Sequence, residues 1–177
     1  MKKIYAAFKA LAKTKAGSWE YDIIIPGYKC NMTDIMASIG LVQLDRYPKL
    51  LERRLELVEK YNKGFEGSKV KPLVHNTKDH KSSNHLYITH VEGATFEQRG
   101  EIITKMAERG ISCNVHYKPL PLLTAYKNLG FDMNDYPNAY SYYVNEVTLP
   151  LHTRLSDEDI EVIVENFKEV IAEVVGE

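Results

Sequence analysis

The 177-residue sequence has little of what marks several large classes of protein. It holds only two cysteines, Cys30 and Cys113, which lie far apart in the sequence. Such a low number favours free thiols in a reducing compartment over a disulfide framework. No apolar run approaches the roughly 20 residues that cross a bilayer. The net charge of −1, from 23 basic and 24 acidic residues, gives no electrostatic footprint for nucleic acid or an anionic membrane. We therefore expect a cytoplasmic protein that binds neither.

Common catalytic signatures are also missing. The sequence has no G-x-S-x-G, Walker or C-x-x-C motif, and no pair of carboxylates stands out for acid–base work. Four histidines recur at intervals of five, a spacing that matches neither a helix face nor the usual zinc spacings. They are His75, His80, His85 and His90. We therefore expect no metal site, and we name no catalytic residue in this chain.

Hydrophobic residues make up 44% and charged residues 27%, which is typical of a globular chain. The length suits one medium domain, or one small domain with a helical extension. Because the composition changes at Ser68, we predict a helical segment over residues 1–67 and a small α+β domain over residues 68–177.

The first segment predicts mostly helix. Residues 2–16 have apolar positions at helical spacing, and residues 19–25 are apolar and β-branched, which favours an extended strand. Thr33 is a candidate N-cap for a helix whose face carries apolar residues. Pro48 suits the first turn of a second helix that reaches about residue 65.

The second segment alternates strands and helices. Strands are predicted at 70–74, 86–91, 111–117 and 147–149, and short helices at 120–130 and 138–145. Two further helices are predicted to begin at capping boxes. One is formed by Thr95 with Gln98, and the other by Ser156 with Asp159. This order favours the α/β class, as an α+β domain with a small, mostly antiparallel sheet and helices on one side.

Two stretches could bind a ligand. Tyr28–Asn31 lies in a Pro-Gly turn ahead of a helix N-terminus, where free N–H groups and the helix dipole favour an anion such as a phosphate. The alternative is a surface turn with a solvated lysine. His116 and Tyr117 lie where the strand over 111–117 ends, and strand ends that lead into loops often carry binding residues. The alternative there is an ordinary exposed histidine.

Four segments, in order, resemble one enzyme family. They are GYKCNMTDIMASIGLVQLDR, NHLYITHV, ERGISCNVHYKPL and VTLPLHTRLSDEDIEVIVENF. They are similar to signature segments of the DegT/DnrJ/StrS aminotransferases, which are pyridoxal-phosphate enzymes that aminate keto sugars attached to nucleotides. The resemblance covers essentially the whole chain.

The resemblance implies that this chain is the C-terminal portion of a fold-type I transferase. Family members are longer, and the lysine that binds the cofactor lies in their first half, in a Ser-x-x-x-x-Lys context followed by glycines. No lysine here has that context, and the sequence has no Gly-Gly pair. The resemblance therefore implies that the chain alone is inactive and does not hold pyridoxal 5'-phosphate (PLP).

The resemblance also implies roles for five residues. In the family's homodimers, the loop before the helix reaches the partner subunit's active site, so Lys29 and Asn31 would contact the cofactor phosphate. Tyr28, His116 and Tyr117 would contact the nucleotide sugar.

The chain departs from the family pattern at four positions. Lys29 stands where asparagine is common, Asn31 where arginine is common, Cys30 where an aromatic residue is usual, and Pro121 where the second histidine of the H-Y motif belongs. The first two departures leave open whether Lys29 or Asn31 meets the phosphate, and the last removes one substrate contact.

The function implied is that of the C-terminal domain of an aminotransferase for nucleotide-linked keto sugars. Its amino donor would be glutamate, and its product would serve the biosynthesis of amino sugars for polysaccharides or glycans. Two alternatives stay open. One is a non-catalytic binding or assembly module, such as a split-gene partner. The other is a sugar dehydratase of the same family, in which histidine replaces the cofactor lysine.

Overall fold

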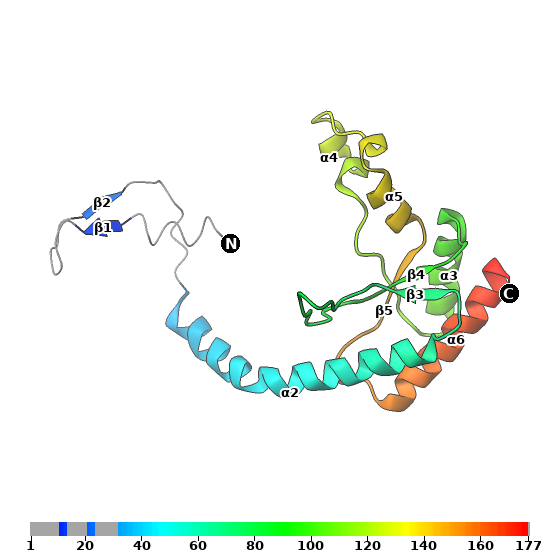
Figure 1. Ribbon diagram of the computed structural model, residues 1–177, viewed down its shortest axis with the longest axis horizontal. Coiled ribbons are helices and arrows are strands. Elements are labelled where there is room, and N and C mark those ends of the chain that lie inside the picture. The colour runs from blue at the N-terminus through cyan, green and yellow to red at the C-terminus, as the bar shows by residue number, and fades with distance from the viewer. Residues whose placement is uncertain (1–10, 14–20, 24–31, 177) are drawn as a thin grey trace. The chain divides into compact units, whose positions relative to one another are not determined.

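The computed structural model describes residues 11–13, 21–23 and 32–176, which fall into two compact units, Met1–Asp45 and Arg46–Glu177 (Figure 1). In the first unit, strand β1 (Leu11–Lys13) pairs antiparallel with β2 (Tyr21–Ile23), so that Leu11 lies opposite Ile23. The strand predicted over 19–25 is thus confirmed at its centre. The helix predicted over 2–16 is wrong at residues 11–13, where strand pairing overrides local helix propensity.

Helix α2 (Asp34–Gly64) begins as the sequence predicts. The Thr33 hydroxyl accepts a hydrogen bond from the Met36 N–H at 3.3 Å, which confirms Thr33 as its N-cap. The prediction of a second helix starting at Pro48 is wrong, because α2 runs through that residue. A proline inside a helix removes one hydrogen bond and crowds the preceding turn. Tertiary packing outweighs this cost, since the later part of α2 buries Leu57 and Tyr61.

The second unit contains a three-stranded antiparallel sheet in the order β3-β4-β5. The strands are β3 (Val70–Pro72), β4 (Tyr87–Val91) and β5 (Glu146–Leu149). Each lies where the sequence predicts a strand. In the pairing of β4 with β5, Tyr87 lies opposite Leu149 and His90 lies opposite Glu146.

One face of this sheet packs against helices to form the core. Helices α3 (Phe96–Glu108) and α6 (Asp157–Val175) contribute apolar stripes, and the later part of α2 contributes aromatic rings. Tyr61 of α2 stacks on Tyr87 of β4 with ring centroids 4.5 Å apart. The predicted capping boxes at Thr95 and Ser156 are both confirmed. So is the predicted α+β fold class with its small antiparallel sheet.

Short helices connect α3 to β5. They are a 3₁₀ turn (Leu120–Leu122), α4 (Thr124–Lys127), a second 3₁₀ turn (Met133–Asp135) and α5 (Pro137–Val144). In Figure 1, α4 and α5 project from the sheet away from α6. The helix predicted over 138–145 is confirmed as α5, whereas the one predicted over 120–130 is divided into two shorter turns.

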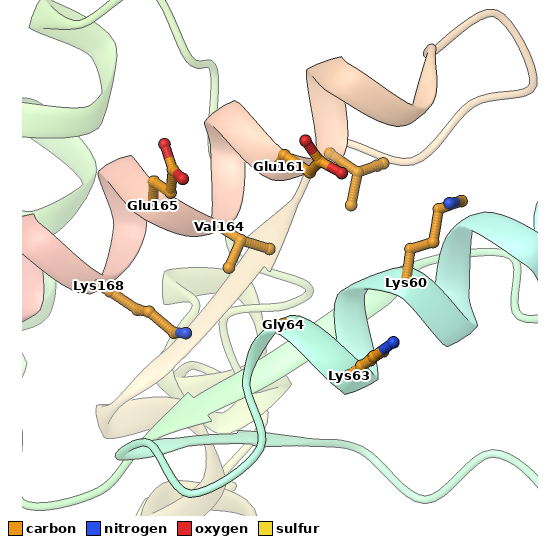
Figure 2. Close-up of a pocket in the computed structure, with 8 residues that line it drawn as sticks. Lys60, Lys63, Gly64, Glu161, Val164, Glu165 and Lys168 are labelled. Carbon is orange, nitrogen blue, oxygen red and sulfur yellow. The ribbon is translucent and has the colours of Figure 1, made fainter.

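Helices α2 and α6 approach each other closely at Gly64. A Cβ atom at this residue would lie 2.9 Å from both γ-carbons of Val164, and Figure 2 shows the two residues facing each other. A groove of about 450 Å³ lies here, with lysines from both helices and glutamates from α6 around it. The absence of a side chain at Gly64 therefore sets the spacing of these helices.

We predict that Gly64→Ala lowers the free energy of unfolding by about 1–3 kcal/mol, because the added methyl group overpacks the contact with Val164. Urea denaturation would measure the loss. Gly100→Ala is the matched control: its Cβ would meet nothing within 4 Å, so it should raise stability by up to about 1 kcal/mol through helix propensity. A double variant with Val164→Ala should show less than the summed loss; strict additivity would contradict the packing argument.

Candidate functional site

The sheet has a second face, opposite the core, and it carries polar side chains. Because successive residues of a strand point to opposite faces, Ile88 and His90 of β4 share this face with Glu146 and Thr148 of β5. Tyr87, by contrast, faces the core. The second face is therefore where β4 and β5 can present polar groups to a ligand.

A cavity of about 270 Å³ lies against this face. Side chains from the sheet, from the segment after residue 114 and from α5 form its walls. They are Leu73, Ile88, His90, His116, Tyr117, Pro119, Ala139, Tyr142, Tyr143 and Glu146. The structure thus brings together the two predicted substrate residues of the second segment, His116 and Tyr117. Their rings are in edge-to-face contact, with centroids 4.7 Å apart.

The segment that carries these two residues is not the predicted strand over 111–117. Only Asn114 pairs with the sheet, through two backbone hydrogen bonds to Thr148 of 3.0 and 2.8 Å. The next two N–H groups donate to side chains: Val115 to Asn114 Oδ1 at 2.7 Å, and His116 to Glu146 Oε2 at 3.0 Å. Side-chain acceptors thus take over from the ladder, and the strand prediction is wrong beyond one bridge.

Glu146 lies at the centre of this arrangement. Glu146 is buried, with only 4% of its surface exposed, and its second oxygen, Oε1, accepts a hydrogen bond from the Thr148 hydroxyl. None of the ion pairs among residues 32–176 includes Glu146. Within the described part of the chain, the carboxylate is therefore held by two hydrogen bonds and not by a cation.

His90 is a second cavity residue that the sequence did not single out as a site. Its Nδ1 lies 3.2 Å from Asn145 Oδ1, and its ring meets the Tyr142 ring edge to face at 4.5 Å. The only indication in the sequence was that His90 lies two residues after Ile88, so that both would share one face of a strand. The sequence does not give the pairing of β4 with β5, and this pairing is what places His90 beside Glu146.

The α5 wall of the cavity is fixed by a buried arginine. Arg99 of α3 is 4% exposed, and its guanidinium carbon lies 4.7 Å from the Phe96 ring centroid and 4.8 Å from that of Tyr143. Such cation–π contacts gain strength when desolvated. Arg99 thereby ties the end of α5 to α3, and a neighbouring cavity of about 240 Å³ places Lys118 and Lys127 next to this wall.

Tyr28, Lys29 and Asn31, with Cys30, lie outside the residues that the structure describes. Burial raises the pKa of the Cys113 thiol to about 12, so it stays protonated at neutral pH.

The four evenly spaced histidines do not come together at one place. Burial lowers the pKa of His75, whose Nδ1 lies 3.3 Å from Ser82 Oγ, and His80 lies 2.8 Å from Thr77 Oγ1. The two side chains thus contact different hydroxyls of their own loop, while His90 belongs to the cavity.

The cavity does not by itself form a PLP site. None of its lining residues is a lysine, and the residues expected near the cofactor phosphate are among those the structure does not describe. What it offers are imidazole, hydroxyl and aromatic groups, which suit the recognition of a polar ligand with an apolar face. Among the described residues, no helix is long and apolar enough to span a membrane.

Comparison with known proteins identifies the family. The model of the DegT/DnrJ/EryC1/StrS aminotransferase family matches residues 1–168. The spore coat polysaccharide biosynthesis protein SpsC of Bacillus subtilis (strain 168) is 35% identical over 163 residues, which are 88% of this chain and 41% of SpsC. A UDP-4-amino-4,6-dideoxy-N-acetyl-beta-L-altrosamine transaminase of Helicobacter pylori is 29% identical over 154 residues, covering 87% of this chain and 41% of that enzyme.

Solved structures agree. Spr1654 from Streptococcus pneumoniae, assigned as a sugar aminotransferase, has been solved in a PLP form that matches with a TM-score of 0.81 at 58% identity, over 98% of this chain and 44% of that one. Its PMP form matches with a TM-score of 0.82 at 57% identity. The chain spans about 41% of the length of the curated relatives it matches. It belongs to the DegT/DnrJ/EryC1/StrS aminotransferase family.

Proposed function

We propose that this chain is the substrate-binding portion of a PLP-dependent aminotransferase for nucleotide-linked keto sugars, with glutamate as the amino donor. It would act in the cytoplasm, in the biosynthesis of amino sugars for polysaccharides or glycans. The observation that carries this proposal is the cavity that joins His116 and Tyr117 to the polar face of the sheet. The relatives support it: one acts on a UDP-linked amino sugar, and SpsC serves polysaccharide biosynthesis.

The role of the chain's own residues is to bind and orient the sugar nucleotide. Imidazole groups of His90 and His116 can bond hydroxyl or phosphoryl oxygens, and the rings of Tyr117 and Tyr142 offer apolar faces to a sugar or base. PLP, when bound, supplies the electron sink of transamination. Because no lysine of this sequence stands in the Ser-x-x-x-x-Lys context of the family, we assign the lysine that binds PLP to a segment outside this sequence.

Lys29 and Asn31 complete the proposal. In the sequence they lie just before α2, whose N-terminus is capped by Thr33. Free N–H groups at a helix N-terminus favour a phosphate. We assign Lys29 and Asn31 to the cofactor phosphate and Tyr28 to the sugar nucleotide, in a homodimer in which these residues serve the partner subunit's site.

An exposed apolar surface in the first unit favours a second candidate, an assembly module. On α2, Ile35 is 76% exposed, Ile39 is 59% exposed and Val42 is 58% exposed. Three large apolar residues at helical spacing on an exposed face are typical of a contact surface. In this reading the chain is a split-gene partner that completes a separate N-terminal half.

We predict that the chain alone, mixed with PLP, shows no visible absorption from cofactor bound covalently to a lysine. Mixing it with a separately expressed N-terminal portion of Spr1654 should restore both that absorption and glutamate-dependent amination of a UDP-linked keto sugar. Absorption by the chain alone would contradict the assignment of the lysine to another segment. Failure of the two pieces to associate would contradict the assembly role.

We also predict that His116→Ala weakens binding of UDP-N-acetylglucosamine, used as the probe, by about tenfold, because one hydrogen bond to the ligand is lost. Isothermal titration calorimetry at fixed salt would measure the dissociation constant. His85→Ala is the matched control, since His85 is exposed and does not line the cavity. Equal affinities for both variants and the unmodified chain would argue against His116 as a substrate contact.

A further inference from the structure

The buried carboxylate of Glu146 requires an explanation beyond packing. Removing a carboxylate from water without a cation beside it is unfavourable, and its two hydrogen bonds offset only part of that cost. A glutamine could fill nearly the same volume without a charge. The two donors that Glu146 receives, the Thr148 hydroxyl and the His116 N–H, show what the charge holds in place.

The register of the neighbouring segment shows what Glu146 replaces. Asn114 and Thr148 exchange both backbone hydrogen bonds, so they form a hydrogen-bonded antiparallel pair. The next hydrogen-bonded pair of such a ladder lies two residues further along each strand, and here it would join His116 to Glu146. In the structure the His116 N–H bonds the side chain of Glu146 at this position.

We propose that Glu146 is a positioning residue of the sugar-nucleotide site. Its carboxylate takes the hydrogen bond that its backbone carbonyl would accept in a continued ladder, and it thereby turns residues 115–117 off the sheet edge. His116 and Tyr117 then line the cavity instead of extending the sheet. The identity of the ligand rests on the proposed function, but the positioning does not.

A charged acceptor suits this task. A carboxylate accepts a backbone N–H more strongly than a neutral carbonyl does, so it can compete with the ladder. Thr148 holds its other oxygen from the same face of β5, two residues along the strand. The side chain is thus fixed at one end by its own strand and at the other by the segment that it diverts.

Two variants separate positioning from simple packing. Glu146→Val removes the side-chain acceptor and the buried charge, and it introduces a residue that favours strands. Glu146→Gln keeps a side-chain oxygen at nearly the same place and should rescue the geometry. Glu92→Val is the matched control, because Glu92 is an exposed glutamate just after β4.

Nuclear magnetic resonance of the whole chain provides the positional readout. In Glu146→Val we expect the ladder to extend, which brings the Hα atoms of Val115 and Val147 close enough for a cross-strand NOE. We expect binding of UDP-N-acetylglucosamine to weaken at least about tenfold, with no loss of thermal stability. Glu146→Gln and Glu92→Val should keep the original NOE pattern, and both should bind within about threefold of the unmodified chain.

Each outcome decides a different statement. If the Val115–Val147 NOE does not form in Glu146→Val, the positioning role is wrong. If it forms while binding is unchanged, the position of His116 does not matter to the ligand, which also overturns the proposal. If the unmodified chain does not bind the probe at all, the proposed function fails, while the NOE still tests the positioning.

A further measurement applies if Glu146→Val does not fold. In Glu146→Gln the amide proton of His116 should move upfield, because a neutral acceptor forms a weaker hydrogen bond than a carboxylate. An unchanged shift would mean that the carboxylate does not hold this N–H in solution.

Discussion

Strand β5 is buried on both faces, and the rest of the second unit depends on its register. Val147 and Leu149 point into the apolar core, while Glu146 and Thr148, which are 4% and 5% exposed, lie on the opposite face, where Glu146 lines the cavity. A shift of one residue would place a carboxylate in the core and valine against the cavity. The same four residues therefore specify both the packing of the sheet and the polar face that lies against the cavity.

The sequence was sufficient to predict features whose hydrogen bonds or contacts join residues close together in the chain. The two capping boxes use hydrogen bonds between residues three apart, so Thr95 with Gln98 and Ser156 with Asp159 could be read directly. The apolar stripe of α6 follows helical periodicity and lies in the core. Strand β4 is rich in β-branched and aromatic residues, and its prediction is confirmed.

The predictions that proved wrong concern competition between distant segments. Residues 11–13 belong to a stretch with apolar residues at helical spacing, but they form a strand that pairs with β2. Pro48 would open a helix by local rules, but packing of the later turns keeps α2 continuous. Residues 111–117 alternate like a strand, yet Glu146, which lies far along the chain, takes the N–H that would extend it. None of these partners can be recognised from the segment alone.

Two residues of the cavity were singled out from the sequence. The position of His116 and Tyr117 at the end of a strand-like segment indicated a binding role, and the structure places both against one cavity. Their neighbours His90, Glu146 and Tyr142 come from β4, β5 and α5, so only the tertiary fold could identify them. The roles of Tyr28, Lys29 and Asn31 stay predictions, since the structure does not describe these residues.

The most direct test of the account asks which surface of the chain meets a nucleotide sugar. Chemical-shift mapping of the isotope-labelled chain with UDP-N-acetylglucosamine would answer it. The account predicts shifts concentrated at His90, His116 and Tyr142. Shifts concentrated in the groove between α2 and α6, or none above those given by uridine alone, would contradict it.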